Sequence, residues 1–200
     1  PDLLWQVAGD LQSLQLAEEA RRALTSMLAD ERITPDRREE VLLHLADLYL
    51  GLDRIDAGLE TIEYYRKTAT SRDRALDADV LEAQLLLSDG QLDEAGQRVA
   101  SVLKHKNLST AAEARAERIS GHVALRQERW ADAAHALERA RAAVTDVAAE
   151  DQLLEGWALY RAGSIAPAGE LLASMDLESL PAASREAALF LRAKVMGEQG

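Results

Sequence analysis

The sequence predicts an all-α protein built from stacked helix pairs. Of its 200 residues only four are Pro and 11 are Gly, while Ala, Leu, Glu and Arg, which favour helices, dominate. Small and aliphatic residues recur with a period in the mid-thirties, which is typical of a helical solenoid. No run of β-branched or aromatic residues between turn residues indicates a strand.

The repeat has two small positions and one aliphatic position in each unit. The first small position is Ala8, Ala46, Ala83, Gly121, Gly156 and Ala193. The second lies twelve residues later, at Ala20, Gly58, Ala95, Ala133 and Ala168, and four residues on comes Leu24, Ile62, Val99, Leu137 or Leu172. A polar turn separates the two small positions. We therefore expect two helices per unit, with close axes at the small residues and the aliphatic side chain in the core.

The predicted helices follow from this pattern and from local capping residues. They are 2–13, 17–30, 35–50, 54–69, 72–88, 92–105, 110–127, 131–146, 148–162, 165–174 and 182–198. Thr34 precedes Pro35 as an expected N-cap, Thr110 with Glu113 forms a predicted capping box, and Ser164 is expected to cap the tenth helix.

The predicted domain is a single solenoid over residues 1–200. Its units are approximately 1–33, 34–70, 71–107, 108–146, 147–178 and a partial unit at 179–200. The chain begins at Pro1 without Met and stops within the pattern, so we expect it to be a fragment of a longer protein.

Two segments carry a resemblance to a known family. "SGHVALRQERWADAAHALERA" has Gly121, Ala133 and Ala140 at small positions and Trp130 at an aromatic position, and "LADLYLGLDRIDAGLETI" follows the same pattern. The chain resembles the tetratricopeptide repeat (TPR) family over nearly its whole length, with about five and a half tandem repeats. The resemblance implies a right-handed superhelical solenoid of antiparallel helix pairs. It also implies a concave groove, lined by the first helix of each pair, that holds a partner's peptide or helix.

The sequence departs from the family's pattern in several ways, one of which lies just before the first small residue of a unit. An aliphatic residue usually precedes the first small residue, but four units have a polar one: Glu82, Ser120, Glu155 and Arg192. We expect the neighbouring apolar residues to take over the packing and rotate those helices slightly.

The groove that the resemblance implies has an acidic half and a more basic half. Residues 1–100 carry 21 acidic and 11 basic side chains, and residues 101–200 carry 14 and 12. The predicted partner-binding residues are the basic and aromatic ones of the second half: Arg115, Arg118, His122, Arg126, Trp157, Tyr160, Arg161, Phe190 and Lys194. Arginine beside aromatic residues is typical of interface hot spots, and its guanidinium binds carboxylates, so an acidic partner segment is expected.

A purely structural interpretation of these residues stays open. Arg115 and Arg118 could pair with Glu113 and Glu117 or with acids of the next unit, and Trp157 could pack between repeats. Trp130 fits a core position of the family and is interpreted as structural.

The same composition argues against several function classes. The net charge of −12 disfavours nucleic-acid binding, and no apolar run approaches the roughly 18 residues that a membrane span needs. The chain has no Cys, its four His residues do not form a zinc motif, and no phosphate-binding or nucleophile motif occurs. We therefore expect no enzyme activity, no catalytic residues, no metal and no cofactor.

The predicted function is a protein–protein interaction scaffold that holds a protein or peptide partner, or another domain of the same chain. One alternative is a periplasmic scaffold of a bacterial envelope or exopolysaccharide-export machine. Another is a structural spacer that self-associates end to end, and an RNA-binding helical repeat is the least favoured. No targeting segment is visible, so the cytoplasm and the periplasm both stay open.

Overall fold

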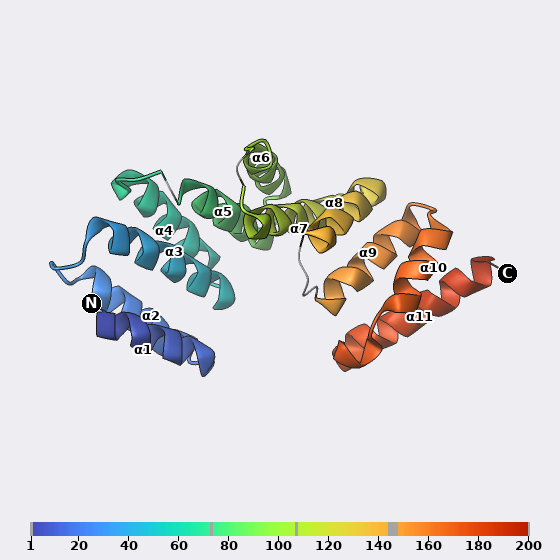
Figure 1. Ribbon diagram of the computed structural model, residues 1–200, viewed down its shortest axis with the longest axis horizontal. Coiled ribbons are helices and arrows are strands. Elements are labelled where there is room, and N and C mark those ends of the chain that lie inside the picture. The colour runs from blue at the N-terminus through green and yellow to red at the C-terminus, as the bar shows by residue number, and fades with distance from the viewer. Residues whose placement is uncertain (1, 73, 107, 144–147, 200) are drawn as a thin grey trace. The chain divides into compact units, whose positions relative to one another are not determined.

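The computed structural model describes residues 2–72, 74–106, 108–143 and 148–199, and all regular structure in these ranges is helical. The helices are α1 Asp2–Ser13, α2 Ala17–Leu28, α3 Pro35–Gly51, α4 Ile55–Thr68, α5 Ala75–Asp89, α6 Leu92–Val102, α7 Thr110–Arg126, α8 Trp130–Ala142, α9 Ala149–Arg161, α10 Ile165–Ser174 and α11 Ala182–Gln199, with a 3₁₀ turn, η1, at Leu177–Ser179 (Figure 1). The prediction of an all-α protein is confirmed. None of the described helices is both long and apolar enough to cross a membrane.

Each predicted helix overlaps one observed α-helix, and the differences lie at the ends and in the caps. Thr34 caps α3 as predicted, because its side chain accepts a hydrogen bond from the Arg37 N–H. The cap of α7 is Ser109 rather than Thr110, since Thr110 is already helical. Ser164 makes no side-chain cap bond, because its ψ of 64° departs from the extended conformation typical of an N-cap. The predicted positions 144–146 lie outside the described residues.

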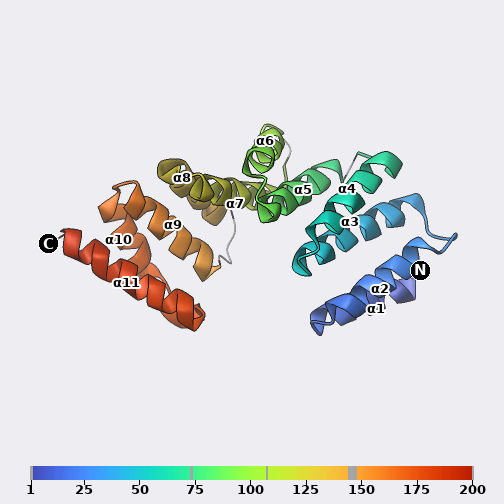
Figure 2. The same cartoon turned by 180° about the vertical axis from the view of Figure 1, so that it is seen from behind.

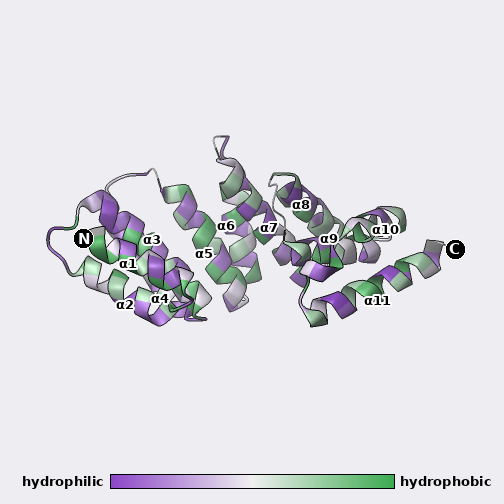
Figure 3. Ribbon diagram, turned by 60° about the horizontal axis from the view of Figure 1, so that its bottom comes forward, coloured by the Kyte–Doolittle hydropathy of each residue, from purple (hydrophilic) through white to green (hydrophobic). Residues whose placement is uncertain are grey.

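The chain divides into two compact units, unit 1 at residues 1–98 and unit 2 at residues 99–200. Within each unit, helices that follow one another in sequence lie side by side as antiparallel pairs, for example α3 with α4 and α7 with α8 (Figures 1 and 2). Hydrophobic and hydrophilic residues alternate along these helices (Figure 3), as expected for amphipathic helices. One continuous solenoid over residues 1–200, with the unit limits given above, stays a prediction.

The turn inside each pair has one backbone design despite its varied sequence. A residue with positive φ recurs every 35 to 38 residues, at Gln15, Asp53, Gly90, Glu128 and Gly163. The next residue donates its N–H to the carbonyl five positions earlier, at 2.8–2.9 Å in all five turns. This is the Schellman motif, which ends a helix through one left-handed residue. The repeat therefore appears in the backbone conformation of the turns as well as in the buried side chains.

The small positions of the repeat allow close helix contacts. A Cβ added to Gly121 would lie 2.7 Å from Leu137 Cγ, and one added to Gly156 would lie 2.8 Å from Leu172 Cδ2. These are pairs between the first small position and the predicted aliphatic residue of the same unit. The prediction for the last unit is wrong, because Ala193 is exposed. Helix α11 instead buries Ala188, Leu191 and Val195, which share one face.

Three of the four polar departures bind the preceding helix pair. Glu155 accepts two hydrogen bonds from Arg141 of α8, and Glu82 accepts two from Arg66 of α4. Arg192 donates to the carbonyls of Leu172 and Met175 at the end of α10, at 2.6 and 3.0 Å. Each side chain therefore links a first helix to the C-terminal end of the helix before it. The polar residues replace an apolar contact with a directional one.

Candidate partner-binding surface

Helix α7 carries the predicted basic residues on one face. Arg115, Arg118 and His122 are half-buried and Arg126 is exposed. Arg118 and His122 both face Asp151 of α9, with Arg118 Nη1 3.6 Å from Asp151 Oδ2 and His122 Nε2 3.4 Å from Asp151 Oδ1. The structural alternative, in which Arg118 pairs with an acid of the next unit, is thus realised. Asp151 partly neutralises the basic surface.

The charge of Asp151 is maintained by its neighbours. Burial by itself would raise the pKa of this carboxyl group. The hydrogen bond with His122 and the positive charge of Arg118 outweigh burial, so the pKa lies below its usual value. Asp151 is therefore ionised near neutral pH and holds one side of Arg118.

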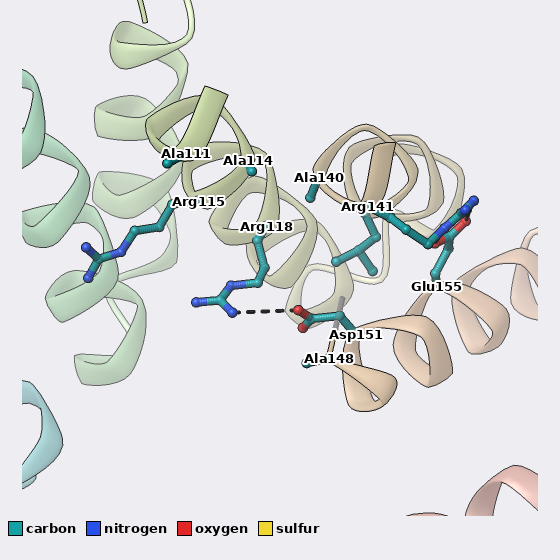
Figure 4. Close-up of a pocket in the computed structure, with 10 residues that line it drawn as sticks. Ala111, Ala114, Arg115, Arg118, Ala140, Arg141, Ala148, Asp151 and Glu155 are labelled. Atoms are coloured by element: carbon teal, nitrogen blue, oxygen red, sulfur yellow. Dashed lines mark hydrogen bonds and ion pairs between the residues drawn. The ribbon is translucent and has the colours of Figure 1, made fainter. Parts of the chain in front are cut away.

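A cavity of about 300 Å³ lies beside this contact, between α7, the end of α8 and the start of α9. Its described lining combines five alkyl side chains with five charged ones: Ala111, Ala114, Arg115, Arg118, Leu137, Ala140, Arg141, Ala148, Asp151 and Glu155 (Figure 4). Three arginines stand against two carboxylates. The described lining residues therefore carry a formal excess of positive charge in a chain whose net charge is −12.

One of the charged pairs in this lining is structural. Arg141 Nε and Nη2 donate to the two oxygens of Glu155 at 2.9 and 3.1 Å, and Glu155 is only 3% exposed. Two parallel hydrogen bonds to a buried carboxylate give a strong, geometrically defined pair. Glu117, which was a candidate partner of Arg118, is instead bound by Arg139 at 2.7 and 2.9 Å.

Sequence reasoning missed Arg141, Asp151 and Glu155 as parts of this site. Arg141 lies on the second helix of its pair, which the family resemblance does not assign to a groove. The sequence did mark Glu155 as unusual, since it is a polar residue at an aliphatic position of the repeat. Nothing in the sequence except its charge pointed to Asp151.

The predicted aromatic residues of α9 form a packed group. The rings of Trp157 and Tyr160 have centroids 6.1 Å apart. The Arg161 guanidinium lies 4.2 Å from the Trp130 ring centroid and 5.8 Å from that of Trp157. Arg161 thus contacts two tryptophans, from α8 and α9, by cation–π interaction. The contact gives Trp130 and Arg161 a role in helix packing, although Arg161 is exposed and the three aromatic side chains are half-buried.

The outer residues of this group connect α9 with α11. The Tyr160 hydroxyl donates to Glu198 Oε1 at 2.7 Å, and this hydrogen bond, followed by burial, raises the pKa of Tyr160. On α11, Lys194 Nζ lies 5.4 Å from the Phe190 ring centroid, and Phe190 is 58% exposed. The predicted residues therefore occur in three groups, on α7, on α9 and on α11. Among the residues with described positions, no group of three or more His, Asp or Glu is placed to hold a metal ion.

Comparisons with known proteins identify the fold. No protein-family model matches the chain, and no curated protein matches it. Solved structures do match. The C-terminal part of a TPR repeat-containing protein from Cytophaga hutchinsonii is 17% identical, with a TM-score of 0.67 over 95% of this chain and 69% of that one. A thermophilic TPR protein from Thermus thermophilus is 17% identical, with a TM-score of 0.66 over 98% and 97%.

A third structure, PilW, described as a widely conserved type IV pilus biogenesis factor, is 16% identical, with a TM-score of 0.69 over 84% of this chain and 74% of that one. At these identities the comparison establishes the fold alone. The chain has the all-α helical-repeat fold of TPR proteins, as its sequence pattern predicted.

Proposed function

We propose that this protein is an interaction scaffold and that unit 2 binds an acidic segment of a partner protein along α7 and α9. The observation that carries the proposal is the charge around the cavity. Arg115 and Arg118 lie one turn apart on α7 at its edge, and the Glu155 carboxylate nearby is already bound by Arg141. A carboxylate from a partner meets a net positive site there.

The contact between Arg118 and Asp151 leaves room for such a partner. At 3.6 Å it is longer than a hydrogen bond, and it approaches one nitrogen of a guanidinium that has five N–H donors. An incoming carboxylate therefore gains hydrogen bonds to Arg118 without displacing a tight pair. Trp157, Tyr160 and Phe190 supply apolar surface for the rest of the segment, together with the cations Arg161 and Lys194.

The narrower hypothesis places the scaffold in a bacterial envelope or exopolysaccharide-export machine. What supports it is the pilus biogenesis factor among the structural neighbours. The chain's negative charge disfavours nucleic acids as partners, and an end-to-end spacer stays the structural alternative.

The test is a binding assay with peptides of matched composition. Fluorescein-labelled 12-residue peptides rich in Asp and Glu are titrated with the full chain, beside the same peptides with Asn and Gln instead. We expect the acidic peptides alone to bind, and Arg115→Glu with Arg118→Glu to weaken binding at least tenfold, on the order expected for hot-spot arginines. Arg22→Glu with Arg72→Glu, which reverses two exposed arginines of unit 1, is the matched control. Equal binding by both double variants would refute the site.

A further inference from the structure

We infer that the acidic segment is anchored by an aliphatic side chain, which enters the cavity between α7, α8 and α9 while a neighbouring carboxylate reaches Arg118. This inference rests on the proposed function and specifies the chemistry of the partner. It predicts a short motif in which Leu, Ile, Val or Met lies within two residues of Asp or Glu.

The shape and lining of the cavity select the aliphatic group. Among its described lining residues, the uncharged ones are four alanines and Leu137, and none of the ten carries an aromatic ring or a hydroxyl group. Water that lies against these alkyl groups has few hydrogen-bond partners on that side, so its replacement there by an alkyl group is favourable. The volume of about 300 Å³ lies at the lower end of the range of ligand pockets, which is roughly 300–1,000 Å³. A branched side chain with its backbone fits this space, and a larger cofactor does not.

The charged residues orient the segment. Figure 4 shows Arg115 and Arg118 on one side of the cavity and the Arg141–Glu155 pair on the other. Because Glu155 is buried and bound through both oxygens, that side is closed to a second carboxylate. On the other side, Arg118 can accept a carboxylate from the partner. Its contact with Asp151, at 3.6 Å, is too long for a hydrogen bond, so its N–H donors are not held there by a tight pair. The apolar anchor and the acidic residue of the partner therefore have separate, adjacent places.

The first step of the test is a selection of 12-residue peptides from a random display library on the immobilised full chain. We expect enrichment of Asp and Glu, with an aliphatic residue at a fixed short distance. The best peptide is then synthesised with its aliphatic residue changed to Ala and, separately, with its acid changed to Asn. Each change is expected to weaken binding about tenfold.

Filling the cavity is the second step. Ala111 lies on α7 at the cavity and is exposed, so Ala111→Leu occupies the space without disturbing the core. We expect about tenfold weaker binding of the selected peptide and no additional loss when the peptide's aliphatic residue is Ala, because the two changes remove the same contact. Ala131→Leu, at another exposed alanine on α8, is the matched control, and Ala148→Leu repeats the test from the start of α9.

The outcomes separate the two proposals. Acidic peptides without an aliphatic preference, bound equally by the Ala111→Leu and Ala131→Leu variants, overturn the anchor and leave the acidic-partner function standing. A selection without acidic enrichment overturns both. Loss of binding in Ala111→Leu and Ala148→Leu, but not in Ala131→Leu, supports the anchor, provided that circular dichroism shows unchanged helix content.

Discussion

The two units stabilise buried carboxylates on their first helices in different ways. In unit 1, Glu39 of α3 is 3% exposed and accepts hydrogen bonds through one oxygen from the Thr70 N–H, the Thr70 hydroxyl and the Ser71 N–H, at 2.6, 3.0 and 3.2 Å. These donors belong to the connection between α4 and α5. The charge is therefore held mainly by backbone dipoles, and it fixes a loop.

In unit 2, the two buried carboxylates of the described residues have arginine partners instead. Glu117 is bound by Arg139 and Glu155 by Arg141, and both arginines lie in the last turn of α8. A guanidinium at a helix C-terminus also interacts favourably with the helix dipole. Substitution can remove both partners of an arginine–glutamate pair at once, whereas it cannot remove the backbone N–H groups that bind Glu39. The two kinds of site should therefore respond differently to substitution.

The largest effect is expected for Arg141→Met in unit 2. It leaves Glu155 buried and unpaired, and breaking a buried pair costs about 3–5 kcal/mol. We expect about 3 kcal/mol less free energy of unfolding, at the lower end because the Arg141 side chain is 35% exposed. Urea unfolding of the full chain at pH 7 measures it.

The double variant Arg141→Met with Glu155→Met is the control. Removing both charges at once leaves no unpaired ion, so most of the lost stability should return. A single variant within about 0.5 kcal/mol of wild type, the usual range for surface changes, would show that the pair is a surface contact.

The second effect compares equivalent small residues of the two units. Ala133 is 0% exposed and lies in a cluster of alanines against which Leu125 and Leu159 pack, so Ala133→Leu overpacks this cluster and should cost about 1–3 kcal/mol. Ala20→Leu in unit 1 should cost less, because its cluster contains Met27, whose unbranched side chain repacks readily. Thermal unfolding of both variants tests the order. No loss in either would mean that the small positions do not set the helix distance.

These cores show why the fold could be predicted from the sequence. The repeat positions follow from burial, which acts on every unit in the same way, and Ala20 and Ala133 are buried as expected. The pattern failed at the last helix. Helix α11 packs through Leu191 and Val195 with Ala193 outside, because in the described residues no second helix of that pair constrains its rotation.

The candidate site was predictable only in part. The family resemblance predicted Arg115 and Arg118 in the lining of a concave groove, and in the structure both line one cavity. It could not supply Asp151 or the partner of Glu155, because pairing across helices depends on side-chain reach rather than on periodicity. The contribution of the predicted residues to partner binding stays a prediction.

The third prediction concerns pH and unit 1. The hydrogen bond from the Thr70 N–H is the main reason why the pKa of Glu39 is lowered, against the opposing effect of burial. A carboxyl group with a lower pKa in the folded state stabilises it above the ordinary value of 4.5, and this contribution disappears as the pH falls through the folded-state pKa. We expect Glu39→Gln to lower the melting temperature at pH 7 and to match wild type at low pH. A constant difference at all pH values would contradict this.

The smallest effects are expected in the Schellman turns, where the units again differ. Unit 1 uses Gln15, Asp53 and Gly90 at the left-handed position, and unit 2 uses Glu128 and Gly163. Gly163 has a φ of +80°, so Gly163→Ala should cost roughly 1 kcal/mol, the strain of an L-residue there.

Glu128→Gly removes the same strain but raises the entropy of the unfolded chain, so the two effects nearly cancel and stability should change by only a few tenths of a kcal/mol. Gly197→Ala is the control within unit 2, and we expect it to raise the free energy of unfolding. A Cβ at this helical glycine meets no atom within 4 Å, and alanine favours a helix over glycine by about 1 kcal/mol. Guanidinium unfolding of the three variants measures the order. If Gly163→Ala were as stable as Gly197→Ala, the turn would tolerate side chains freely, and its repetition along the chain would reflect helix spacing rather than a conformational requirement.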